Sequence, residues 1–169
     1  ELSAKRLEVL RALLPNIVKV GEILDPANEY ARRTRGEYEQ AFRALGMEPI
    51  FVDVPTPTEL TRALEEVSRR GAQALIVRGD PVFISNRERI IRLANQLGLP
   101  TMTEGRQYVE AGALASYAPK AAEVRLQTAA LIDKILRGAK PADLPIQQSS
   151  EFELVVNLTT ATALGINIP

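Results

Sequence analysis

The chain repeats one pattern three times: a stretch with helical hydrophobic spacing ends at a glycine, and a short apolar run follows. The glycines are Gly46, Gly71 and Gly98, and the apolar runs occupy residues 49–54, 74–77 and 99–102. Glycine adopts the left-handed conformation that ends many helices, and short uninterrupted apolar runs are typical of strands buried on both faces. The pattern therefore predicts a parallel α/β sheet.

The same periodicity extends to both ends of the chain. Apolar residues at helical spacing predict a first helix at 3–14, which Pro15 ends before a strand at 17–24. The other expected helices are 30–45, 60–70, 86–97, 106–110, 119–138 and a terminal helix closed by Gly165, and the other strands are 113–116 and 152–156. We predict a doubly wound, mostly parallel α/β sheet with helices on both faces and the strand order 2-1-3-4-5.

Two segments have the sequence of a capping box, in which two side chains satisfy free backbone amides at a helix start. They are residues 56–59, with proline at the first helical position, and residues 85–88. Ser85 could instead contact a ligand. Because Glu88 completes its capping box, we expect Ser85 to act mainly as a helix cap.

Length and charge narrow the class of protein. The chain has 169 residues, 46% of them apolar, which suits one compact domain. Its 21 basic and 21 acidic residues give no net charge, so nucleic acid is not an expected partner. The arginines between positions 32 and 43 alternate with Glu37 and Glu39, which favours a solvated helix face over a phosphate-binding patch.

The chain contains no cysteine and no histidine, which excludes thiolate chemistry, disulfides and histidine-assisted nucleophiles and removes the usual zinc ligands. No glycine-rich loop of the dinucleotide or Walker type occurs, so we expect no cofactor. No apolar run approaches the about 20 residues of a membrane helix. The chain also shows no signal peptide and no starting methionine, so we expect a soluble piece of a longer protein.

In a doubly wound sheet, ligands bind in loops at the carboxyl ends of the strands, beside the switch in strand order. Asp25 and Asp80 follow the first and third strands, whose loops flank that switch. The two carboxylates could serve a small metal-dependent hydrolase, although the third acid and the lysine or phosphate loop of such sites are not visible. Alternatively, each aspartate turns the chain together with the proline that follows it.

Two more side chains at this edge have two interpretations each. Asn28 could bind a ligand through its amide, or it could cap the helix that follows. Tyr117, just past a strand, is either a stacking surface for a ligand or an aromatic residue at the edge of the core. The spacing of the residues leaves both questions open.

Several segments resemble the ABC-transporter substrate-binding protein family, and they stand in the family's order. They read ELSAKRL at 1–7, DPAN at 25–28, DPVFIS at 80–85, VEAGAL at 109–114, DKILRGAKPADLP at 133–145 and FELVVN at 152–157. The resemblance covers nearly the whole chain. It implies the two-lobed periplasmic-binding-protein fold of the first type, in which some family members bind aromatic amino acids.

The resemblance implies that this chain is a single lobe of such a receptor. Residues 1–118 would form the ligand-binding lobe, 119–145 a crossover helix and connector, and 146–169 a returning strand and terminal helix. The implied function is non-enzymatic: an ABC importer's solute-binding component holds a small organic molecule, such as an aromatic or other amino acid, between two lobes. The implied partners are a permease and an ATPase, and the implied location is periplasmic or otherwise extracytoplasmic.

Carrying the family's ligand loops onto this chain, and adding Asp25 from the strand-end argument, gives a set of candidate ligand-binding residues. The set is Asp25, Asn28, Asp80, Ser85, Glu104, Arg106 and Tyr117. The chain departs from many relatives at Ala118 and Lys120, where they have glycine and aspartate, and at Arg78, which replaces a usually apolar residue. These departures bear on which ligand is bound.

The long helix at 119–138 would pack on the other lobe in a protein of this fold. Without that lobe, its apolar stripe would have no sheet to cover, so we expect this chain alone to form a homodimer through the helix. The stripe is Ala121, Val124, Thr128, Leu131 and Ile135. An alternative class is a stand-alone α/β sensor domain, but the acidic triad and strand-end lysine of such domains are missing.

Overall fold

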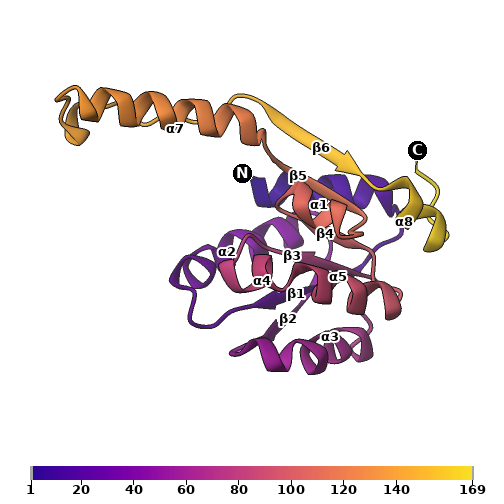
Figure 1. The fold of residues 1–169 in the computed structure, drawn as a ribbon. Helices are drawn as coiled ribbons and strands as arrows, with labels where there is room; N and C mark the ends of the chain where they lie inside the picture. The colour runs from indigo at the N-terminus through magenta and orange to yellow at the C-terminus, as the bar shows by residue number, and fades with distance from the viewer. Residues whose placement is uncertain (1, 169) are drawn as a thin grey trace.

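The computed structural model describes residues 2–168 and contains one sheet of six strands (Figure 1). The strands are β1 (Lys19–Leu24), β2 (Glu48–Asp53), β3 (Ala74–Val77), β4 (Thr101–Thr103), β5 (Ala115–Pro119) and β6 (Phe152–Val156). Their order is β2-β1-β3-β4-β5-β6, with β1 to β5 parallel and β6 antiparallel to β5. The predicted order 2-1-3-4-5 is confirmed, and β6 extends it at one edge.

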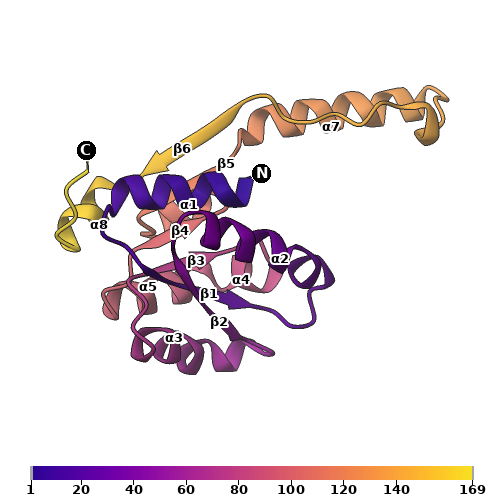
Figure 2. The ribbon, with the colours of Figure 1, turned by 180° about the vertical axis from the view of Figure 1, so that it is seen from behind.

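Helices cover both faces of this sheet, as predicted (Figures 1 and 2). The longer helices are α1 (Leu2–Leu13), α2 (Glu29–Ala44), α3 (Leu60–Arg69), α5 (Arg87–Gln96) and α7 (Ala121–Leu136). The shorter ones are α4 (Pro81–Ser85), α6 (Arg106–Glu110) and α8 (Leu158–Ala163), with 3₁₀ turns at Pro57–Glu59 and Pro141–Asp143. No helix among the described residues is long and apolar enough to cross a membrane.

Two hydrophobic cores lie on opposite faces of the sheet. One is formed by residues of α3 to α6, such as Leu64, Phe83 and Tyr108, and the other by residues of α1, α2 and α8, such as Leu10 and Phe42. The helices approach the strands closely. At Gly21 of β1, an added Cβ would lie 2.2 Å from Val67 Cγ1 of α3, so only glycine fits this position without repacking.

One of the expected helix caps is wrong. Asp80, not Ser85, begins the helix after β3: its carboxylate accepts hydrogen bonds from Val82 N and Phe83 N, and Pro81 occupies the first helical position. Because α4 starts there, Ser85 lies in its last turn, where its hydroxyl donates to Pro81 O at 2.9 Å. Helix α5 starts after Asn86, whose side chain makes no capping bond.

The capping box expected at residues 56–59 forms only in part. Proline does occupy the first position of the 3₁₀ turn Pro57–Glu59, as predicted, but the Thr56 side chain makes no capping hydrogen bond to the backbone. Its hydroxyl instead contacts Thr58 Oγ1 at 2.7 Å and Glu59 Oε1 at 3.4 Å. The turn itself is closed by the backbone, where Glu59 N donates to Thr56 O at 3.0 Å.

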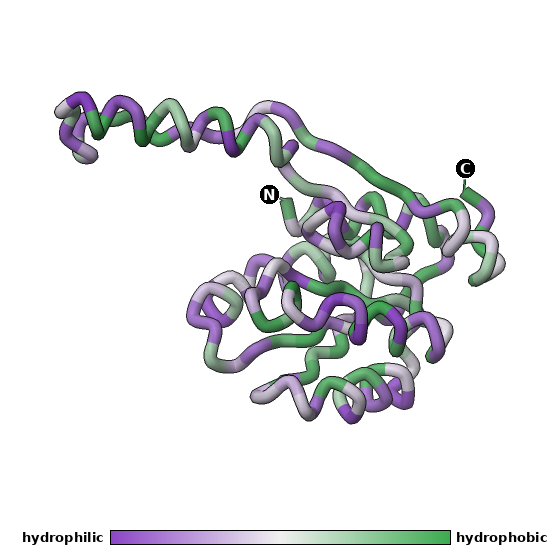
Figure 3. The backbone as a smooth tube through the Cα atoms, in the orientation of Figure 1, coloured by the Kyte–Doolittle hydropathy of each residue, from purple (hydrophilic) through white to green (hydrophobic). Residues whose placement is uncertain are grey.

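Helix α7 and the segment that returns beside it project from the sheet and its helices (Figures 1 and 2). We call residues 120–151 the arm. No residue of α7 is buried, although hydrophobic residues recur along it in Figure 3. Of the expected apolar stripe, Val124 and Ile135 are 40% and 41% exposed, and off the stripe Leu126 and Leu136 are 73% and 81% exposed. Residues 2–168 therefore cover the stripe only in part.

Candidate functional site

The candidate site lies at the carboxyl ends of β1, β3 and β4, which are neighbours in the sheet. The loops that leave these strands carry Asp25 and Asn28, then Arg78 and Asp80, and then Glu104. Because β1 is followed along the chain by β2 on one side and later by β3 on the other, this is the switch in strand order where open α/β sheets bind ligands.

Asn28 and Asp80, both expected at the site, meet across the switch. Asn28 Nδ2 donates to Asp80 Oδ2 at 2.5 Å, while its Oδ1 caps α2 by accepting from Ala31 N at 3.1 Å. Asp80 Oδ1 accepts from Val82 N at 2.7 Å. Both side chains therefore act as helix caps, and the pair fixes the two loops relative to each other.

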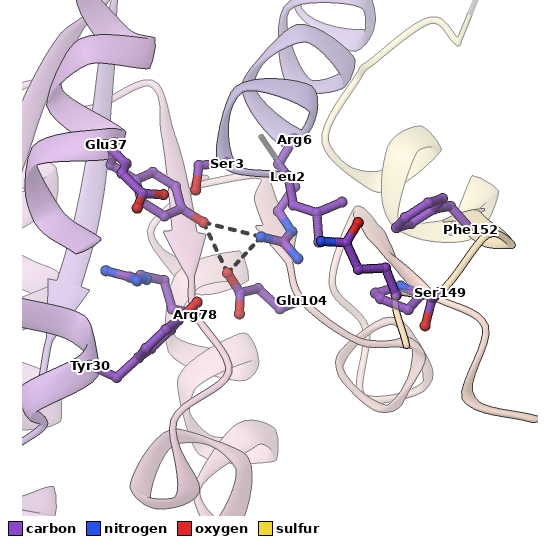
Figure 4. Close-up of a pocket in the computed structure, with 12 residues that line it drawn as sticks. Leu2, Ser3, Arg6, Tyr30, Glu37, Arg78, Glu104, Ser149 and Phe152 are labelled. Carbon is purple, nitrogen blue, oxygen red and sulfur yellow. Dashed lines mark hydrogen bonds and ion pairs between the residues drawn. The ribbon is translucent and has the colours of Figure 1, made fainter. Parts of the chain in front are cut away.

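Glu104 is the centre of a second, larger cluster (Figure 4). Its Oε1 accepts hydrogen bonds from Arg6 Nη1 at 2.8 Å and from the Tyr38 hydroxyl at 2.9 Å, and its Oε2 accepts from Gly79 N at 2.8 Å. Arg6 Nε also donates to Tyr117 O at 2.9 Å. The cluster thus joins α1, α2 and the ends of β3, β4 and β5.

Burial shapes the acid–base properties of Tyr38. Its ring is buried, and burial together with the neighbouring Glu104 carboxylate raises the pKa of its hydroxyl well above the ordinary value, although Arg6 opposes this. The hydroxyl therefore stays protonated and remains a donor to Glu104. Tyr38 and Arg6 hold the Glu104 carboxylate in place beside the cleft.

Arg78 and Glu22 form a buried pair below this cluster. Arg78 Nη1 donates to Glu22 Oε1 at 3.4 Å and to Ala31 O at 3.2 Å, and Nη2 donates to the Thr34 hydroxyl. The guanidinium carbon lies 4.6 Å from the Tyr38 ring centroid. Burial raises the pKa of Glu22 to about 8, even though Arg78 acts to lower it.

Arg6, Tyr38, Arg78 and Glu104 line one open cleft of about 490 Å³ (Figure 4). Its wall combines cations, anions, aromatic rings and small polar groups. The lining residues are Leu2, Ser3, Arg6, Tyr30, Glu37, Tyr38, Arg78, Glu104, Pro119, Gln148, Ser149 and Phe152. A cleft with charged groups of both signs beside aromatic rings suits a small zwitterionic or amphipathic organic molecule.

Of the seven candidate residues, Glu104 lines this cleft, while Asn28, Asp80 and Asp25 line a small pocket that shares Tyr30, Arg78 and Glu104 with it. Asp25 Oδ1 accepts from Ala27 N at 2.8 Å within its own turn. The other candidates lie outside both the cleft and this pocket, and Ser85 is exposed in α4. Arg106 makes a two-point ion pair with Glu153 of β6, with distances of 2.7 Å and 3.2 Å. Tyr117 stacks on Phe152 with ring centroids 5.7 Å apart.

The last two contacts lie where β5 and β6 lead into and out of the arm. Arg106 ties α6 to β6, and the stacked rings join the two strands that connect the sheet to α7. The structure therefore brings Asn28, Asp80 and Glu104 to one edge of the sheet, and places Arg106 and Tyr117 at the junction with the arm.

Sequence reasoning missed Arg6, Glu22, Tyr38 and Arg78 as a group. The sequence contains signals for three of them. Arg6 lies three or four residues from apolar neighbours on its helix, and Tyr38 lies four residues before Phe42, on the same face of the helix at 29–44. Glu22 interrupts an apolar strand. A charged residue at a position whose neighbours are all buried is a sign of a polar cluster inside the fold.

No group of three or more His, Cys, Asp or Glu residues within 2–168 is placed to hold a metal ion. Asp25 and Asp80, which the hydrolase alternative requires, both belong to turns or helix caps, and Asp80 also accepts the bond from Asn28. The geometry gives that alternative no further support.

Comparison with known proteins identifies the family. Residues 1–169 match the family described as ABC transporter substrate binding protein. A curated relative, the tyrosine-binding protein of Clostridioides difficile (strain R20291), is 22% identical over 162 residues, which are 96% of this chain and 47% of the relative. The chain thus spans about half the length of that relative.

Solved structures agree on the fold. A conserved domain protein of Vibrio cholerae O1 biovar El Tor has a TM-score of 0.92 and 26% identity, with 99% of this chain and 56% of that chain covered. The ABC domain in complex with L-Trp from Streptococcus pneumonia has a TM-score of 0.91 and 24% identity over the same shares. Since the family match extends from the first residue to the last, this chain belongs to the ABC transporter substrate-binding protein family, a family of binding proteins and not of enzymes.

Proposed function

We propose that this chain is one lobe of the extracytoplasmic receptor of an ABC importer, and that the receptor binds an amino acid, with an aromatic amino acid as the first candidate. The observation that carries the proposal is the cleft, in which the Arg6–Glu104–Tyr38 cluster lies beside Tyr30 and Phe152. An aromatic amino acid offers the complementary groups: an ammonium, a carboxylate and a ring.

The relatives point to the same class of ligand. The Clostridioides difficile protein is a tyrosine-binding protein, and the streptococcal domain was crystallised with L-Trp. Among the side chains of this chain, Glu104 and Asp80 offer acceptors for an ammonium group, while Tyr30, which is 69% exposed, offers a ring that can move over a ligand. Asn28 would hold Asp80 in position for this contact.

The arm supports the two-lobed part of the proposal. This chain covers 56% of each of the two solved structures described above, and α7 carries apolar side chains that the described residues leave partly or largely exposed. A second lobe that packs on α7 would bury this surface and close the open side of the cleft. Ligand contacts made by both lobes would then favour the closed state, which a permease and its ATPase could distinguish from the open state.

The proposal is tested by calorimetry on the full-length receptor with L-tryptophan, L-tyrosine and L-phenylalanine. We expect at least one to bind, and Glu104→Gln to weaken binding about tenfold to a hundredfold, because it removes a charged acceptor from a buried cluster. Glu65→Gln, on the exposed face of α3, is the matched control and should bind as the wild type does. If none of the three amino acids binds, and mass spectrometry finds no amino acid released from the denatured receptor, the proposal is wrong.

A further inference from the structure

Behind Arg78, which lines the cleft, lies a buried carboxyl group that the proposed binding mode does not use. Glu22 lies within β1, in register with Ile76 of β3, and is completely buried. Its Oε1 accepts one long bond of 3.4 Å from Arg78, and its Oε2 has no partner among residues 2–168. A buried carboxylate with so few donors is poorly stabilised, because it has lost its hydration without full replacement.

Arg78, in contrast, is well held without Glu22. Its guanidinium donates to Ala31 O and to the Thr34 hydroxyl, both on α2. Its carbon Cζ lies 4.6 Å from the Tyr38 ring centroid and 5.8 Å from that of Tyr30, and both rings favour a cation. Arg78 therefore keeps its charge and its place whether or not Glu22 is ionised.

Arg78 lines the cleft, and residues 2–168 do not use all of its N–H groups. Its Nε donates to none of these residues, and its Nη2 carries a second N–H besides the one that the Thr34 hydroxyl accepts. In a guanidinium, the Nε and Nη2 groups form the edge that grips a carboxylate at two points. Arg106 uses this same edge on Glu153 elsewhere in the protein, at 3.2 Å and 2.7 Å.

The charged groups around Glu22 determine the net charge beside Arg78. The groups that act on it are Arg78 from the end of β3, Glu104 from the end of β4, and Arg35 and Tyr38 from α2, with Arg6 of α1 bonded to Glu104. With Glu22 ionised, the carboxylates of Glu22, Glu104 and Asp80 stand against the buried arginines Arg6 and Arg78. Protonation of Glu22 removes one negative charge beside Arg78, so the surroundings of Arg78 become more positive by one charge, while Glu37 at the rim is exposed and screened.

We propose that Arg78, with a protonated Glu22 behind it, is the subsite that recognises a carboxylate on the ligand, and that a carboxylate bound there keeps the proton on Glu22. The inference rests on the proposed function, since it names the ligand group that this cleft selects. It makes two statements: ligands without a carboxylate bind more weakly, and the affinity for ligands with one falls as the pH rises and Glu22 loses its proton.

The test uses the full-length receptor and three probes: L-tryptophan, indole-3-propionate, which lacks the ammonium, and tryptamine, which lacks the carboxylate. Calorimetry at pH 7, 8 and 9 should show the dissociation constants of the first two rising about threefold to tenfold in the wild type. The Glu22→Gln variant keeps the shape of the side chain and cannot ionise. Its dissociation constants should therefore rise less between pH 7 and pH 9 than those of the wild type. Glu48→Gln, a carboxyl of β2 at the opposite end of the strands, is the matched control and should behave as the wild type does.

Arg78→Lys keeps the charge and removes the two-point edge, so it should reduce the preference for L-tryptophan over tryptamine. If Arg78→Lys fails to fold, the pH dependence of binding in the wild type and in Glu22→Gln still tests the inference. Equal pH slopes in the wild type and Glu22→Gln would overturn the inference while leaving the proposed function intact.

A second measurement does not depend on any ligand. Infrared spectroscopy of the free receptor at pH 7 should show the carbonyl stretch of a protonated carboxylic acid, and Glu22→Gln should lack this band. A missing band in the wild type would overturn the inference even if amino acids bind. A band in the wild type, together with a failure of all amino acids to bind, would count against the proposed function and not against the protonation of Glu22.

Discussion

Helices α3 and α7 both have apolar residues at helical spacing, but their surroundings are very different. On α3 the apolar positions Leu60, Ala63, Leu64 and Val67 are all buried against the sheet. On α7 no residue is buried. The periodicity of a sequence therefore shows that a helix has an apolar face, but it does not show whether the surface that covers this face lies in the same part of the molecule.

The largest difference between the two helices should appear when one leucine is truncated. Leu64→Ala in α3 should lower the free energy of unfolding by about 2–5 kcal/mol, because it leaves a cavity in a closely packed core. Leu126→Ala in α7, at a residue that is 73% exposed, should change it by less than about 0.5 kcal/mol in the chain of residues 1–169.

Urea denaturation of both variants measures these changes directly. Similar losses for the two variants, measured at concentrations where the chain is a monomer, would mean that α7 packs against the sheet of its own chain in solution. The comparison between α3 and α7 would then have to be revised.

Glu22 and Glu123 extend the comparison from apolar groups to charged ones. Burial raises the pKa of Glu22 in the sheet to about 8, whereas the pKa of Glu123 in the arm is lowered by hydrogen bonds from the backbone of Ser150 and Glu151. The two carboxyl groups should therefore give the folded state opposite dependences on pH.

Between about pH 5 and pH 8, folded Glu22 holds a proton that unfolded Glu22 has lost. The free energy of unfolding of the wild type should therefore fall as the pH rises through this range, by about 1.4 kcal/mol per pH unit relative to Glu22→Gln. Urea denaturation at pH 5, 6, 7 and 8 gives this difference. A constant difference across the range would show that Glu22 is ionised in the folded protein.

Much of the fold could be predicted from the sequence, because local rules determine it. The short apolar runs predicted β2, β3 and β4, and their chain order with the helices between them predicted the sheet. The cap at Ser85 was wrong because two local signals overlap. Asp80 followed by proline starts α4 five residues earlier than the capping box would, and only the fold shows which start is used.

The candidate site was harder to predict, since its central cluster depends on contacts between distant residues. Glu104 was expected from the family resemblance, but its donors Arg6 and Tyr38 lie 98 and 66 positions away along the chain. No spacing rule connects residues so far apart. What the sequence does show is that Arg6 and Glu22 occupy positions where an apolar residue would be usual, and such positions deserve a search for a polar partner.

The exposed face of α7 leads to a prediction about association. Each apolar side chain that moves from water into an interface contributes roughly 1.5–3 kcal/mol, so the chain of residues 1–169 should form a dimer through α7. Light scattering should show a mass that rises with concentration, and Ile135→Glu should return it to that of a monomer. Arg125→Gln, an exposed polar position on the same helix, is the control. A monomer at all concentrations would contradict the prediction.

The smallest effect is expected within the arm itself. Glu123 Oε1 accepts from Ser150 N and from the Ser150 hydroxyl, both at 3.0 Å, and Oε2 accepts from Glu151 N at 3.0 Å. These bonds attach the start of α7 to the returning segment, where the side chain of Lys120 makes no capping bond. Because they favour the ionised carboxylate, their contribution should be present at neutral pH and be lost as the pH falls below about 4.5.

Glu123→Ala should therefore speed hydrogen exchange at the amides of Ser150 and Glu151, while exchange at β1 and β3 stays as in the wild type. The reason is that few buried contacts hold the arm, so it can open locally without unfolding the sheet. Gln127→Ala, which removes only a side-chain partner of Glu123, is the matched control and should leave the two amides protected. Faster exchange in β1 as well would contradict this prediction, because it would mean that the arm and the sheet unfold together as one cooperative unit.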